Sequence, residues 1–223
     1  MGYYLLTFLA LIITIFAEVL VQIRYKKYSK ILNSKKISGF EVAKKILEEN
    51  GLEDIYIVET QGFLSDHYDP TNKVIRLSHE IFHGENISAL AVAAHECGHA
   101  IQYKEGNIFI KIRSLIFPIV NLCSKLSYAV ILISLFTGFM KLFYLGIAML
   151  LIILFFQLVT LPVEFDASNK ALNEMKRLDI CENTENDSCK KVLFAAALTY
   201  VASLATSILE ILRLILIASD NND

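Results

Sequence analysis

The stretch Leu77–Gln102 reads LSHEIFHGENISALAVAAHECGHAIQ and contains the pattern H-E-x-x-H twice. The first copy is His79–His83 and the second copy is His95–His99. Two histidines four residues apart share one face of a helix, so they can bind one metal ion, and the intervening glutamate can serve as the general base of a zinc hydrolase. The pattern fixes only three residues, so one copy, or both, can also arise by chance.

The residues that follow each copy distinguish the two. The first copy is followed at once by Gly84, a typical helix stop, whereas the second copy continues into the helix-forming run Ala100–Lys104. Because both imidazoles must be held rigidly, the motif requires a helix that extends past its second histidine. We therefore interpret the first copy as a solvated helical turn and predict a metal-binding helix over Ile87–Lys104.

The composition indicates a membrane protein. The 223 residues are 55% hydrophobic with a mean hydropathy of +0.49, and the apolar residues concentrate in a few long runs. These runs predict an anchor over residues 1–23, a hairpin of two spans over 114–163 and a fourth span over 192–219. The lipid bilayer is thus the first expected partner. The net charge of −2 gives no indication of nucleic-acid binding.

The basic residues predict the orientation of the spans. Six lysines and arginines follow the first span with no acidic residue among them: Arg24, Lys26, Lys27, Lys30, Lys35 and Lys36. The positive-inside rule places such a segment in the cytoplasm. Residues 24–113 and 164–191 are therefore expected on the cytoplasmic side of the plasma membrane, with both termini outside.

Residues 24–113 predict a small α+β domain. Ser38–Glu41 fits a capping box that opens a helix, and Gly51 fits the end of that helix. Ile55–Glu59 and Val74–Leu77 are typical of strands, and Asp69–Asn72 is typical of a turn. The predicted fold class is a mainly α membrane protein with about four transmembrane helices and a small zincin-like α+β cytoplasmic domain.

Glu164 is the candidate third ligand, because a catalytic zinc ion usually takes three protein ligands and a water. It directly follows the third span, and two crossings separate it from His99, so both lie on one side of the membrane. Taken alone, a carboxylate there is either a solvated helix end or a ligand. The motif on the same side favours the ligand. Pro162 is compatible with a helix start or a kink.

Four longer motifs resemble those of a known family. They are Ser65–Pro70 (SDHYDP), Ala93–Gln102 (AAHECGHAIQ), Leu161–Ser168 (LPVEFDAS) and Ala195–Val201 (AAALTYV). Together they resemble the bacterial membrane-bound neutral zinc metallopeptidases over nearly the whole chain. The resemblance implies a membrane-embedded peptidase with His95 and His99 as zinc ligands and Glu96 as the catalytic residue. In that family, the position of the first copy does not carry H-E-x-x-H.

A more distant similarity extends to the CAAX-processing and heat-shock membrane peptidases, which pair H-E-x-x-H with a later Glu-x-x-x-Asp. Glu164 matches the glutamate, but Ser168 stands where these enzymes have aspartate. Asp166 lies about 200° around a helix from Glu164 and cannot simply replace it. The hydrogen-bond partner of the first histidine is therefore open at this point.

The expected reaction is hydrolysis of a peptide or protein substrate by a zinc-activated water, with one Zn²⁺ per chain and Glu96 as general base. Candidates for oxyanion stabilisation, substrate contact or support of the ligands are His67, Tyr68, Asp166, Ser168, Asn169 and Tyr200. His67 also fits a plain surface turn. Val74–Leu77 is expected to accept substrate by edge addition. The alternatives are a non-proteolytic membrane module with structural or absent zinc, and another zinc-dependent amide hydrolase. No feature specifies an oligomeric state.

Overall fold

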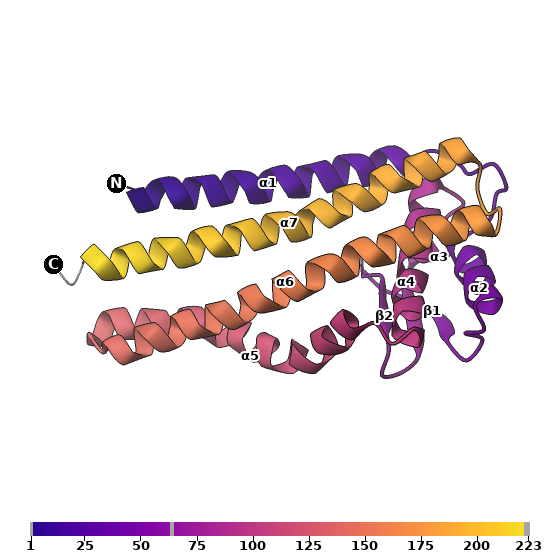
Figure 1. The fold of residues 1–223 in the computed structure, drawn as a ribbon. Coiled ribbons are helices and arrows are strands. Elements are labelled where there is room, and N and C mark those ends of the chain that lie inside the picture. Colours follow the sequence, from indigo (N-terminus) through magenta and orange to yellow (C-terminus); the bar gives the residue numbers. More distant parts are fainter. Residues whose placement is uncertain (1, 63–64, 221–223) are drawn as a thin grey trace. The chain divides into compact units, whose positions relative to one another are not determined.

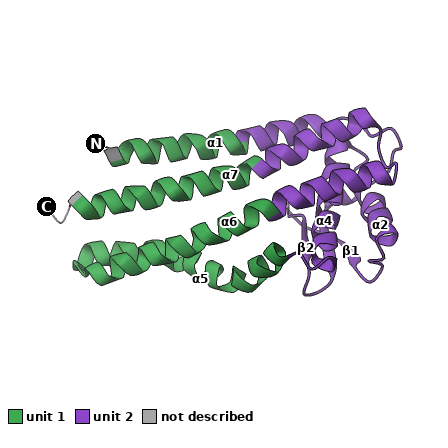
Figure 2. Ribbon diagram, viewed as in Figure 1, with its two compact units in different colours: residues 1–18, 108–162, 198–223 green, residues 19–107, 163–197 purple. Residues whose placement is uncertain are grey.

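The computed structural model describes residues 2–62 and 65–220, which form seven helices and three strands (Figure 1). In chain order these are α1 (Gly2–Tyr28), α2 (Gly39–Glu49), β1 (Tyr56–Thr60), β2 (His67–Asp69), β3 (Val74–Ser78), α3 (His79–Phe82), α4 (Ile87–Lys104), α5 (Ile108–Thr137), α6 (Met140–Arg177) and α7 (Asn183–Asp220). They divide into two compact units (Figure 2). Residues 19–107 and 163–197 form one unit, and the other described residues form the second.

Four helices are long and apolar enough to cross a membrane: α1, α5, α6 and α7. The predicted fold class is confirmed, since these helices accompany one small three-stranded sheet. The second of them begins at Ile108, earlier than predicted. It is joined to α6 by Gly138 and Phe139, and Gly138 has the positive φ of 71° that commonly ends a helix.

Helix α6 continues well beyond its apolar run. Pro162 lies inside it, so the helix does not begin there, and the helix carries on to Arg177. Residues 164–177 contain no further proline or glycine, and most of them are compatible with a helix, which lets it extend past the apolar part. One helix thus joins a candidate span to the segment that carries Glu164.

The local signals of the smaller domain are confirmed. Ser38 and Glu41 form both hydrogen bonds of a capping box at the start of α2, an arrangement worth about 1 kcal/mol. Helix α2 ends at Glu49, and Gly51 follows with φ of +59°. The Asp69 carboxylate accepts hydrogen bonds from the backbone N–H groups of Thr71 and Asn72, as expected of the turn.

The sheet has the order β1-β3-β2, with β1 parallel and β2 antiparallel to β3. Strand β3 is therefore paired on both edges, and four of its five residues are buried. The expectation that Val74–Leu77 accepts substrate by edge addition is wrong, because a central strand has no free edge. Strand β2, which carries His67 and Tyr68, was not predicted as a strand; it forms one edge of the sheet.

Helix α4 lies in the core of this unit and is buried over most of its length. Cys97 faces α2, where its thiol contacts the Ala43 carbonyl oxygen at 3.6 Å, and it is one of four free cysteines. Gly98 faces α6, and a side-chain carbon at this position would overlap the carbonyl group of Ala167. The absence of a side chain at Gly98 therefore lets the backbones of α4 and α6 come together.

Replacing Gly98 with alanine is expected to destabilise the protein, because the obstacle is backbone and cannot rotate away. Overpacking of this kind costs about 1–3 kcal/mol, which should lower the thermal midpoint of the detergent-solubilised chain by at least about 2 °C. Asn169→Ala is the control, since this side chain is exposed on α6. A Gly98→Ala protein as stable as the control would contradict this account of the helix contact.

Candidate metal centre

Three side chains converge where α4 meets α6. The Nε2 atoms of His95 and His99 lie 3.2 and 3.7 Å from the same oxygen, Oε2 of Glu164. The donor atoms of all three residues lie within 4.8 Å of one another. All three residues belong to the unit formed by residues 19–107 and 163–197. The structure thus brings together the three candidate ligands that the sequence suggested.

In both imidazoles, Nε2 faces Glu164 and Nδ1 contacts another side chain. Nδ1 of His95 lies 3.2 Å from the Ser168 hydroxyl, and Nδ1 of His99 lies 3.0 Å from the Gln102 amide oxygen. When Nδ1 carries the proton and donates it, the lone pair of Nε2 is free to bind a metal ion. The Gln102 contact selects this tautomer for His99, because an amide oxygen can only accept, and the Ser168 hydroxyl is compatible with the same tautomer for His95.

The Ser168 hydroxyl contacts the first histidine of the motif, the partner that the sequence comparison with Glu-x-x-x-Asp left open. The open question about that partner is answered by geometry: residue 168 is one helical turn after Glu164, so both face α4. A neutral hydroxyl replaces a carboxylate in this role.

Gln102 is the site residue that the sequence reasoning overlooked. It is fully buried, and its amide group donates hydrogen bonds to the Val163 carbonyl at 2.8 Å and to the Asp166 carboxylate at 2.7 Å. Asp166 also accepts a hydrogen bond from the side chain of Asn107. Asp166 thus supports His99 through Gln102. The available signal was a glutamine one turn after the second histidine, on a helix predicted to be rigid.

Glu96, which lies between His95 and His99 in the sequence, is buried. Burial raises its pKa to about 7, and the nearby carboxylates of Glu164 and Asp66 add to this rise. The nearby His95 and the polar backbone of Tyr68 lower the pKa of Glu96 and so oppose this rise. The backbone of edge strand β2 therefore lies beside the Glu96 carboxylate.

The side chains of the remaining candidates make other contacts or are exposed. His67 is exposed, with Nδ1 2.8 Å from the Ser65 carbonyl oxygen, and the Tyr68 ring contacts the Tyr103 ring edge-on. Burial raises the pKa of the Tyr68 hydroxyl to about 12. Asn169 is exposed on α6. Tyr200 belongs to the other compact unit, and its role stays a prediction.

The donor set fits zinc. Two imidazole nitrogens and one carboxylate are a frequent ligand set of catalytic zinc, and each histidine has the outer hydrogen bond that such ligands require. Glu164 is 2% exposed, so its charge needs a partner: an unpaired buried carboxylate would be costly. These residues can therefore hold a zinc ion.

Comparisons with known proteins agree with this geometry. Residues 3–219 match a family described as "Putative neutral zinc metallopeptidase". A protein of Bacillus subtilis (strain 168) named "Putative membrane protease YugP" is 41% identical over 218 residues, which are 98% of this chain and 97% of that protein. No solved structure matches the chain. On this evidence, the chain belongs to the neutral zinc metallopeptidase family, as the resemblance of its motifs predicted.

Proposed function

We propose that the protein is an integral-membrane zinc metallopeptidase with one catalytic centre at His95, His99 and Glu164. The observation that carries the proposal is the convergence of these three donors, each imidazole held by its own outer hydrogen bond. A zinc ion bound there would act as a Lewis acid and activate a water for attack on an amide.

Glu96 is the proposed general base. A pKa near neutrality suits a group that takes up a proton and later releases it to the leaving amine. Since Glu96 is only 7% exposed, few water molecules can compete for its carboxylate. Glu164 is not the base in this proposal, because its carboxylate faces both candidate ligand histidines, but its charge helps to raise the pKa of Glu96.

The substrate is proposed to be an extended peptide that pairs with β2. This strand forms an edge of the sheet, and its Tyr68 backbone lies near the Glu96 carboxylate. Main-chain pairing with a sheet edge binds extended peptides with little demand on their side chains. A peptide held there would bring its amide groups close to the base.

Glu96→Gln is expected to lower hydrolysis of a protein substrate by about 10²–10⁴-fold, the usual contribution of a positioned base. Zinc content should stay at the wild-type value, because Glu96 is not a ligand in the proposal. The measurement is cleavage by the purified full chain, with metal analysis of the same sample. Full activity in the Gln variant would sink the mechanism, and a structural zinc site would show no such dependence.

Gln102→Ala and Ser168→Ala are each expected to weaken zinc binding by about 10–100-fold, because each removes the outer partner of one ligand. Competition with a zinc chelator measures the affinity. Asn169→Ala is the matched control on α6, since its side chain is exposed beside Ser168. Equal affinities for all three variants would refute the support role, and Gln102→Glu should restore part of the affinity.

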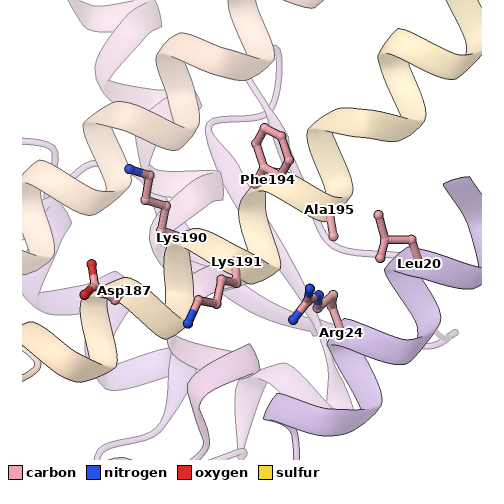
Figure 3. A pocket seen from close by; sticks show the side chains of 7 residues that line it. All are labelled: Leu20, Arg24, Asp187, Lys190, Lys191, Phe194 and Ala195. Carbon is pink, nitrogen blue, oxygen red and sulfur yellow. The ribbon is translucent and has the colours of Figure 1, made fainter.

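We also propose that the metal centre faces the cytoplasm, as the positive-inside rule indicates. A pocket of about 410 Å³ is lined by Leu20, Arg24, Asp187, Lys190, Lys191, Phe194 and Ala195 (Figure 3). Its cations come from α1 and α7, directly beside the apolar parts of both helices. Within the described part of the chain, Arg24, Lys190 and Lys191 make no ion pair, so their charge is available to bias insertion.

Reporter fusions test this orientation. Green fluorescent protein fused after Asp179 should fluoresce, whereas alkaline phosphatase fused after Asp223 should be active, because α7 would carry the second fusion across the membrane. Exchanging the two reporters should silence both. An active phosphatase after Asp179 would reverse the proposed orientation.

A further inference from the structure

The first H-E-x-x-H copy is not simply an unused repeat of the second. Within the described residues, its two histidines form the other group of potential metal ligands, together with Glu59. The ligand atoms of this group also lie within 4.8 Å of one another. All three residues of this cluster are exposed, whereas the candidate catalytic centre is largely buried.

The sheet brings Glu59 to this copy. In the parallel pairing of β1 with β3, Glu59 lies beside Leu77 and Thr60 beside Ser78. Helix α3 starts at the next residue, His79, so the carboxylate of Glu59 lies against the first turn of that helix. Backbone hydrogen bonds hold β1 in register with β3, and the turn that carries both histidines follows β3 directly.

The three side chains already face one another. Oε1 of Glu59 lies 2.6 Å from Nδ1 of His79, and Oε2 of Glu59 lies 3.1 Å from Nε2 of His83. The two imidazole centroids are 4.8 Å apart. Each oxygen of one carboxylate therefore serves one histidine, with both rings on the same side of the turn.

Aromatic packing holds the second ring in place. The His83 ring lies 4.9 Å from the Phe82 ring, and Phe82 in turn stacks on Phe40 of α2 at 4.9 Å. The backbone N–H of His83 bonds to the His79 carbonyl at 3.2 Å, which closes the turn that carries both ligands. A metal ion would therefore find the ligands partly arranged, with less ordering entropy to overcome.

We propose that Glu59, His79 and His83 form a second site for a divalent transition-metal ion, with Zn²⁺ as the best match. Two imidazoles and one carboxylate suit zinc, whose bonds to these donors measure about 2.0–2.2 Å. Because the side chains are exposed, they can turn to reach one ion. Exposure also leaves the other coordination positions to water, so the ion exchanges readily with the solution.

This second site is a binding site and not a second catalytic centre. The glutamate of its motif, Glu80, accepts a hydrogen bond from the Tyr25 hydroxyl at 3.1 Å and is turned to that partner. The third ligand of this second site, Glu59, belongs to strand β1, whereas Glu164 belongs to helix α6. What the ion would do here is link β1 to α3.

Zinc counting on the full chain tests the proposal. The chain is purified in detergent without a histidine tag, dialysed against buffered free zinc and measured by elemental mass spectrometry. Wild type should bind two equivalents. The His79→Ala/His83→Ala and His95→Ala/His99→Ala variants should each bind one, and the quadruple variant none. The fifth histidine of the chain provides the control: His67→Ala should keep two.

The readouts separate this site from the catalytic centre. If the His79→Ala/His83→Ala variant binds as much zinc as wild type, the second site is refuted whatever happens at His95 and His99. A second arm uses immobilised Ni²⁺: wild type should be retained and Glu59→Gln, a conservative surface change, should elute earlier. Equal retention of wild type and the His79→Ala/His83→Ala variant would also overturn the proposal.

Discussion

The candidate site depends on the close contact between the backbones of α4 and α6 at Gly98 and Ala167. On α4, His99 directly follows Gly98, and His95 precedes Gly98 by three residues. On α6, Glu164 and Ser168 flank Ala167. If the helices were separated by one methyl group, the distances of 3.2 and 3.7 Å between imidazole nitrogens and the Glu164 oxygen would lengthen. A glycine without catalytic chemistry therefore sets the geometry of the metal ligands.

The hydrogen bonds around the ligands form a second constraint. Gln102 links the ring of His99 to the Val163 carbonyl and to Asp166, so α4 and α6 are joined by polar contacts as well as by packing. Every polar atom of this buried amide is used, as a dry interior requires. Such a network holds one arrangement of the two helices in preference to others that are nearly as well packed.

Much of this was readable from the sequence. Helix α4 has the predicted bounds, because an Asn N-cap and a run of alanines define it locally, and the four spans follow from apolar length. The parts that were missed depend on contacts between distant residues. Strand β2 is three residues long and is stabilised by pairing with β3, and Gln102 gains its role only when Asp166 approaches it. The central position of β3 in the sheet likewise could not be predicted, because the pattern of hydrophobic residues in a sequence does not determine the order of the strands.

The position of Glu164 on α6 has a consequence for how the protein can be divided. A fragment made of residues 24–113, the natural choice for a soluble domain, would keep both histidines and the base but lose the third donor together with Ser168 and Asp166. The same helix that is apolar enough to span a membrane carries these groups. The candidate third donor and a candidate span are thus parts of one continuous helix, and a fragment limited to residues 24–113 lacks the complete set of candidate donors.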